Sequence, residues 1–189
     1  MNEDLLRRMF KYFNVFMVFM WKIGLAKFLN FWPKVLGKYI VITHFGRNTG
    51  KKYQTPVNYC EIDGDIYCSA GFGVESDWYK NLQHNPNIEI WTKDGWWHAR
   101  AEDISNHPQR ITIMRNVLVA SGFAAYLFGF NLSRMDDEVL DDATKDYCLL
   151  RLDRVSAQTG PDGPGEYSWV WQVISFLLFF LLITRKRNK

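Results

Sequence analysis

The stretch YQTPVNYCEIDGDIYCSAGF (Tyr53–Phe72) contains two strand-like runs that flank the pair Asp63-Gly64. An Asp-Gly pair between such runs is typical of a two-residue turn that joins antiparallel strands. Asp94-Gly95 lies between NIEIWT and WWHARAEDI and predicts a second hairpin. Because no strand–helix–strand repeat follows, the pattern favours a mainly β, α+β fold in which helices pack on a small β-barrel.

Further elements are expected on both sides of these hairpins. KYIVITHF (38–45) and YCLLRLDRV (147–155) are predicted strands, and the acidic segment 133–146 is a predicted surface helix or loop. Ser76 is the predicted N-cap of a short helix that Asn85-Pro86 ends. Ser105 or Asn106 is the predicted N-cap of a longer helix that ends at Gly122.

The charge of the chain is concentrated at its two ends. The 189 residues carry a net charge of +3, yet residues 1–38 hold seven Lys/Arg against two Asp/Glu, and residues 185–189 hold four Lys/Arg. A nucleic-acid-binding protein would place its basic residues on the folded module, so this class is excluded. Basic residues beside apolar segments indicate contact with anionic lipid. The cysteines and histidines lack metal-ligand spacing, so no metal site is predicted.

Both ends of the chain are predicted to be apolar helices. For LLRRMFKYFNVFMVFMWKIG (5–24), burial in the domain or a dimer interface and a position in the membrane interface both stay open. WVWQVISFLLFFLLI (169–183) follows a Pro/Gly linker and is predicted to insert into a membrane. Its 15 residues would span only about 22 Å, so full crossing stays open. The predicted layout is an N-terminal helical segment (1–36), a barrel (37–155), a linker (156–167) and a C-terminal membrane segment (168–189).

The basic turn FGRNTGKKY (45–53) separates two of the predicted strands. It has too few residues between its glycines for a P-loop, and Lys52 replaces the required hydroxyl. Glycine-bracketed N–H groups and an arginine are typical of an anion site. A solvated hairpin loop fits the same residues, and the turn alone does not separate the two interpretations.

Three segments in order, GRNTGKKYQTPVNY, DGDIYCSAGFG and SDWYKNLQHNPNIEI, carry a resemblance to a known family. Together they resemble the deazaflavin-dependent nitroreductases, also described as deazaflavin-dependent quinone reductases, of the split β-barrel group. The resemblance covers residues 37–155. It implies an anionic deazaflavin coenzyme of the F420 type, with its tail in the basic turn. Tyr59 is a candidate proton donor, and the residues implied in cofactor binding are Gly46, Arg47, Thr49, Gly50, Lys51, Lys52, Pro56, Ser69, Gly71, Gly73, Trp78 and Asn81.

The sequence also departs from the family pattern. Asn48 and Tyr53 stand where family members often have basic residues, and Ala70–Phe72 lacks a lysine that some members carry. Fewer cations attract a polyanionic tail less strongly, which leaves FMN as the alternative cofactor.

Two functions are therefore carried forward. The first is a membrane-associated oxidoreductase, with its barrel in the cytoplasm, that passes hydride from the reduced deazaflavin to a lipophilic quinone or nitro compound. The second is a flavin-binding accessory module of a membrane complex without catalysis of its own. Whether the chain forms a homodimer or joins a membrane complex stays open.

Overall fold

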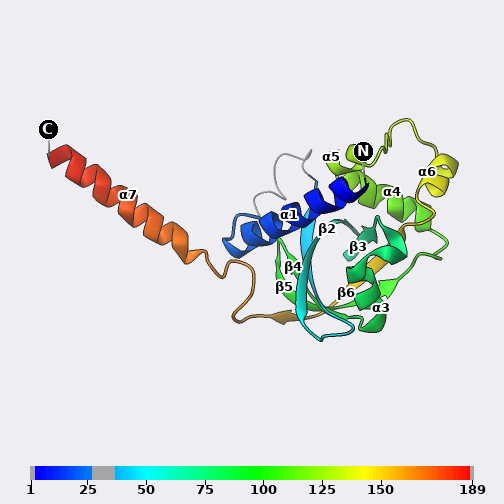
Figure 1. The fold of residues 1–189 in the computed structure, drawn as a ribbon, viewed down its shortest axis with the longest axis horizontal. Helices are drawn as coiled ribbons and strands as arrows, with labels where there is room; N and C mark the ends of the chain where they lie inside the picture. Colours follow the sequence, from blue (N-terminus) through cyan, green and yellow to red (C-terminus); the bar gives the residue numbers. More distant parts are fainter. Residues whose placement is uncertain (1–2, 27–36, 188–189) are drawn as a thin grey trace.

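Six antiparallel strands close into a barrel in the computed structural model, which describes residues 3–26 and 37–187 (Figure 1). The strand order around the barrel is β1-β2-β3-β6-β5-β4, and the pairing of β4 with β1 closes the ring. The predicted α+β barrel is confirmed. The strands are β1 (Tyr39–Phe45), β2 (Lys52–Ile62), β3 (Asp65–Ala70), β4 (Asn87–Thr92), β5 (Gly95–Asp103) and β6 (Cys148–Gln158).

Both predicted hairpins form. In the β2–β3 turn Asp63 and Gly64 have φ values of 52° and 92°, and this pair of positive values is what a tight hairpin turn requires. Ile62 then pairs with Asp65, which sets the register of the whole β2–β3 ladder. In the second hairpin, Thr92 pairs with Gly95.

Apolar side chains fill the interior of the barrel. The core includes fully buried aliphatic residues from four strands: Ile40, Ile42, Ile66, Ile90, Leu150 and Leu152. On the opposite face of β1, Val41 is also fully buried, because α1 (Glu3–Lys22) covers that face. Trp21 of α1 packs there on Trp91 of β4, with ring centroids 6.5 Å apart. The N-terminal helix therefore packs on the barrel through one face, while its opposite face, with Tyr12, Val15, Phe16 and Phe19, is exposed.

Other short helices surround the barrel, and one of them begins later than predicted. They are the 3-10 helix η2 (Gly73–Glu75), α3 (Asp77–His84), α4 (Arg110–Ala120), α5 (Phe123–Leu127) and α6 (Asp137–Ala143). The bounds predicted for α3 are confirmed. The N-cap predicted for α4 is wrong, because Gln109 occupies that position. Pro108 disfavours helical geometry at the residue before it, and the Ser105 hydroxyl accepts a hydrogen bond from Leu149 N instead of capping a helix.

The predicted linker is partly a strand. Residues Ser156–Gln158 pair with Trp96–His98, so β6 extends three residues beyond its predicted end. The rest of the linker contacts the end of α1, since Gly165 N donates to Trp21 O over 2.9 Å and Tyr167 N donates to Lys22 O over 2.8 Å.

The C-terminal helix α7 (Trp169–Arg187) extends away from the barrel (Figure 1). Its apolar side chains from Val173 to Ile183 are exposed, and near its base Trp171 Nε1 donates to Ile23 O over 2.8 Å. Within the described residues, no helix combines the length and the apolar character needed to cross a membrane. The predicted C-terminal membrane helix is therefore not supported as a span. Parts of the predicted terminal segments, residues 1–2, 27–36 and 188–189, lie outside the described residues.

Gly73 permits the close contact between η2 and the residue that precedes Tyr147. Its φ is 52°, and a β-carbon there would lie 2.0 Å from the carbonyl oxygen of Asp146. Gly64 also has a positive φ, but a β-carbon there would meet nothing within 4 Å. An alanine at Gly64 would therefore cause backbone strain alone, whereas an alanine at Gly73 would cause both strain and steric overlap.

We expect Gly64→Ala to lower the free energy of unfolding by about 1 kcal/mol, through strain alone. Gly73→Ala adds an overlap with backbone and should cost about 2–4 kcal/mol. Urea unfolding of both variants and the wild type measures the difference. Equal losses would contradict the close approach at Gly73.

Candidate functional site

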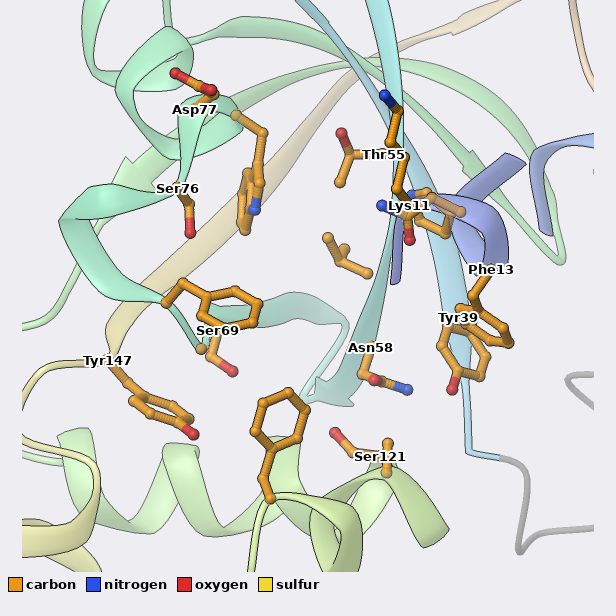
Figure 2. Close-up of a pocket in the computed structure, with 18 of the residues that line it drawn as sticks. Lys11, Phe13, Tyr39, Thr55, Asn58, Ser69, Ser76, Asp77, Ser121 and Tyr147 are labelled. Carbon is orange, nitrogen blue, oxygen red and sulfur yellow. The ribbon is translucent and has the colours of Figure 1, made fainter. Parts of the chain in front are cut away.

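A cavity of about 760 Å³ lies between β2 and the helices that surround it (Figure 2). One wall comes from α1, the next from the β3–α3 connection, and the floor from α4 and α5. Figure 2 shows Lys11 and Thr55 across the open space from Ser76 and Asp77, with Tyr147 and Ser121 toward the other end. Apolar groups dominate the lining, including Phe13, Val18, Val57, Phe72, Trp78, Leu118, Phe128 and Phe130.

Four of the predicted cofactor-binding residues line this cavity: Pro56, Ser69, Gly71 and Trp78. Trp78 also packs against the barrel core, and its part in cofactor binding stays a prediction. Beside it, the residue Ser76 lines the cavity, and its hydroxyl oxygen is buried without a hydrogen-bond partner. A buried polar atom without a partner is costly, so this oxygen is suited to a hydrogen bond with a ligand.

Tyr53 at the end of the basic turn lines the cavity, whereas the glycines and cations of the turn do not, and Arg47 reaches the cavity rim through Asp77. The Arg47 guanidinium donates to Asp77 Oδ1 over 3.0 Å, and Asp77 is a lining residue. Within the turn, N–H groups of Gly46, Thr49 and Gly50 donate to carbonyl oxygens of the turn itself. These N–H groups are therefore occupied in this structure, and the cationic side chains are the part of the turn that can attract an anion.

The lysines of the turn have different surroundings. Lys52 Nζ lies 3.0 Å from the buried carboxylate of Glu89 on β4. This ion pair offsets part of the positive charge of Lys52. Lys51 is exposed. If Lys52 moved toward a ligand, it would leave a buried carboxylate unpaired. Arg47 and Lys51 can reorient toward a ligand without this cost.

Asn81 connects the turn to the interior. Its Oδ1 accepts from both Arg47 N (3.0 Å) and Arg47 Nη1 (3.1 Å), while its Nδ2 lies 3.1 Å from His44 Nδ1. His44 Nε2 in turn lies 3.0 Å from Thr55 Oγ1. Burial lowers the pKa of His44 to about 4, so this imidazole is neutral at pH 7. Asn81 was predicted as a cofactor-binding residue, and here it positions the basic turn.

Two further predicted residues, Tyr59 and Gly73, also lie away from the cavity lining. Tyr59 is buried in the barrel core, where burial raises its phenol pKa to about 12. Its role as a proton donor stays a prediction. Gly73 is buried beside Asp146, and the close contact there accounts for the glycine.

Sequence reasoning missed several lining residues. Thr55, Phe72 and Ser76 lie within the motif segments, so strand alternation and proximity to Ser69 and Trp78 were a signal for them. Lys11, Phe13, Phe128 and Tyr147 come from distant segments, and nothing local marks them as lining residues. In the described part of the chain, no cluster of three His, Cys, Asp or Glu side chains is arranged to hold a metal ion.

Comparison with known proteins gives one family match. The family described as F420H(2)-dependent quinone reductase matches residues 30–131. No curated protein matches the sequence.

Solved structures with a similar arrangement are distant. They include an F420-H2-dependent reductase, FDR-A (16% identity, TM-score 0.44, 61% of this chain and 93% of that one). A conserved hypothetical protein from Mycobacterium tuberculosis is 19% identical, with a TM-score of 0.44 over 71% of this chain and 78% of that one. The haem storage protein HutZ from Vibrio cholerae is 12% identical, with a TM-score of 0.45 over 66% and 86%. These likenesses carry no argument about activity.

The buried neutral His44 makes stability depend on pH. Its pKa is about 4 in the folded protein and near the ordinary 6.5 in the unfolded chain, so the unfolded state binds the proton more tightly. The contribution is fully present above about pH 6.5 and is lost as the pH falls toward 4. Between pH 7 and pH 4.5 we expect a loss of about 2–3 kcal/mol from this group.

Urea unfolding at both pH values, compared between wild type and His44→Gln, isolates this contribution because the carboxylates titrate in both proteins. His98→Gln, at an exposed position, is the matched control and should keep the wild-type pH dependence. If His44→Gln loses as much stability as the wild type on acidification, His44 is not the group responsible.

Proposed function

Because the chain belongs to the F420H(2)-dependent quinone reductase family, we propose that it passes hydride from reduced F420 to a lipophilic acceptor at a membrane surface. Family membership makes the chain an oxidoreductase with the deazaflavin coenzyme F420 as its cofactor. The observation that carries the proposal is the family match over residues 30–131, which contains the basic turn and most of the cavity lining. The acceptor, of quinone or nitro type, and the membrane association belong to the proposal.

The cavity fits a flat, polar-edged ring. Phe72, Trp78 and Phe128 provide apolar surface of the kind on which a conjugated ring packs. The unpartnered hydroxyl of Ser76 provides a polar atom that a ring oxygen or nitrogen would satisfy. The anionic tail would bind at the rim, where Arg47 and Lys51 can pair with phosphate or carboxylate.

The residues of the chain bind, orient and exclude water, whereas the hydride comes from the coenzyme. When bound, the reduced deazaflavin supplies a hydride, and a quinone that takes this hydride and one proton becomes a quinol. Helix α1 covers one side of the cavity with Phe13 and Val18, which limits the access of water to the ring.

We propose that the chain associates with a membrane through two apolar surfaces and that the barrel lies on the cytoplasmic side. The outer face of α1 exposes Phe16 and Phe19, while the same helix lines the cavity through Phe13 and Val18. Helix α7 exposes apolar residues over most of its length, and basic residues flank both segments in the sequence. An exposed apolar surface of this extent is typical of a contact with lipid or protein, and flanking positive charge favours anionic lipid.

We expect Arg47→Ala to weaken F420 binding by about 1.5–3 kcal/mol, because it removes a charge-assisted hydrogen bond to an anion. Asp77→Asn is the matched variant, and we expect it to change the affinity for F420 in the opposite direction. It removes the carboxylate that competes with the ligand for Arg47, so binding should become tighter.

Fluorescence titration of F420 into the wild type and both variants provides the measurement. Wild-type affinity in Arg47→Ala would remove this side chain from the site. Failure of the wild type to bind F420, or preference for FMN, would contradict the proposed cofactor. Binding without turnover of any acceptor would favour the accessory module.

The acceptor should be recognised partly through its apolar tail. In liposomes we expect a higher kcat/KM for a long-tailed menaquinone-like acceptor than for a short-tailed analogue with the same head group. Removal of residues 169–189 should reduce this preference, because the enzyme is then concentrated less strongly at the lipid surface. Absorbance of the reduced deazaflavin follows the reaction. If the truncated chain keeps the same preference for the long-tailed acceptor, α7 does not contribute to acceptor access.

A further inference from the structure

A line of hydrogen bonds runs behind the cavity wall from the basic turn to β2. It starts at Arg47, passes through Asn81 and His44, and ends at the Thr55 hydroxyl. Asn81 and His44 are 5% and 3% exposed, whereas Thr55 lines the cavity. The line therefore connects a rim cation to a polar atom inside the site.

Each bond in this line has a fixed direction. The Arg47 main-chain N–H and guanidinium can only donate, so the atom of Asn81 that faces them must be its carbonyl oxygen. The amino group of the same carboxamide then faces His44 Nδ1 and donates to it. A neutral imidazole that accepts at Nδ1 carries its proton on Nε2, and Nε2 therefore donates to Thr55 Oγ1.

The burial of His44 supports this assignment. Its pKa is lowered to about 4, so the doubly protonated ring, which would place two donors face to face at Asn81, is not formed near neutral pH. The hydrogen bonds also keep this direction if the Arg47 side chain moves toward an anion. In that case the Arg47 main-chain N–H, 3.0 Å from Asn81 Oδ1, still holds the carboxamide.

The consequence falls on Thr55. Because its oxygen accepts from His44, its own hydroxyl proton is left to donate elsewhere. Among the described residues, the hydrogen bond given for this hydroxyl is the one to His44. Thr55 lies across the cavity from Ser76 and Asp77 (Figure 2), so the donor belongs to the wall of the site.

We propose that Thr55 donates a hydrogen bond to an oxygen of the bound deazaflavin and that His44 is the positioning residue that fixes this direction. The inference rests on the proposed cofactor, whose ring carbonyl and side-chain oxygens are acceptors. A threonine that donated to His44 instead would offer the ligand only an oxygen lone pair, which repels a carbonyl or phosphate oxygen.

The direction of the line can be read in the free protein. With ¹⁵N-labelled histidine, NMR of the full chain at pH 7 should show His44 as the neutral Nε2–H tautomer, identified by the signal missing in His44→Gln. A merely structural histidine has no required tautomer. The Nδ1–H tautomer would reverse every bond from Asn81 to Thr55 and overturn the proposal.

The donor itself is tested by matched substitutions of Thr55. Thr55→Val should weaken F420 binding about 3–10-fold, the usual effect of one neutral hydrogen bond, whereas Thr55→Ser keeps the hydroxyl and should bind within about 2-fold of the wild type. Thr43→Val is the control, since Thr43 is a buried threonine of β1 that does not line the cavity. It should leave binding unchanged.

Fluorescence titration of the full chain gives the affinities, and thermal unfolding without ligand establishes that each variant is folded. If the wild type binds F420 and Thr55→Val binds as tightly, this inference is overturned while the proposed function stands. Equal losses in Thr55→Ser and Thr55→Val would likewise overturn it. If the wild type does not bind F420, the proposed function falls and this inference falls with it.

Discussion

The filled interior of the barrel is the constraint on which the rest of the structure depends. Ile40, Ile42, Ile90 and their neighbours are fully buried, so the inside of the closed sheet holds side chains and leaves little room for a large ligand. A binding site must then form outside, where helices lie against the strands. The cavity between β2 and helices α1, α3, α4 and α5 is the result, and its shape depends on how those helices pack.

Strand β1 links this constraint to the site. Its residues are buried almost throughout, because the barrel core takes one face and α1 takes part of the other. His44 therefore enters a buried position, where an imidazole costs free energy unless its two nitrogens have partners. Asn81 and Thr55 provide them. Asn81 of α3 also accepts hydrogen bonds from Arg47, which attaches α3 to the basic turn. The bonds that provide partners for the buried His44 therefore also orient Arg47 and Thr55 at the cavity.

Features encoded by neighbouring residues were predictable from the sequence. The Asp-Gly pairs, Ser76 and Asn85-Pro86 correctly marked the two hairpins and α3, because turn and cap chemistry is local. The cavity was not predictable in the same way, since Lys11, Phe128 and Tyr147 meet only through packing of distant segments. The position of Tyr59 follows from strand alternation, because it shares the inward face of β2 with Val57.

Helices α1 and α7 lie outside the family match, as do α6 and β6. Residues 30–131 contain the basic turn, β2 and α3, to which the proposed function assigns the cofactor, whereas α1 and α7 lie beyond that range. Hydrogen bonds connect the segments next to these helices, since Trp171 of α7 donates to Ile23 O just after α1, and Gly165, before α7, donates to Trp21 O of α1. Only α1 lines the main cavity, and it does so with Phe13 and Val18 while its other face is apolar and exposed. In the proposed function, the matched residues would therefore hold the cofactor, and α1 would take part in the approach of the acceptor.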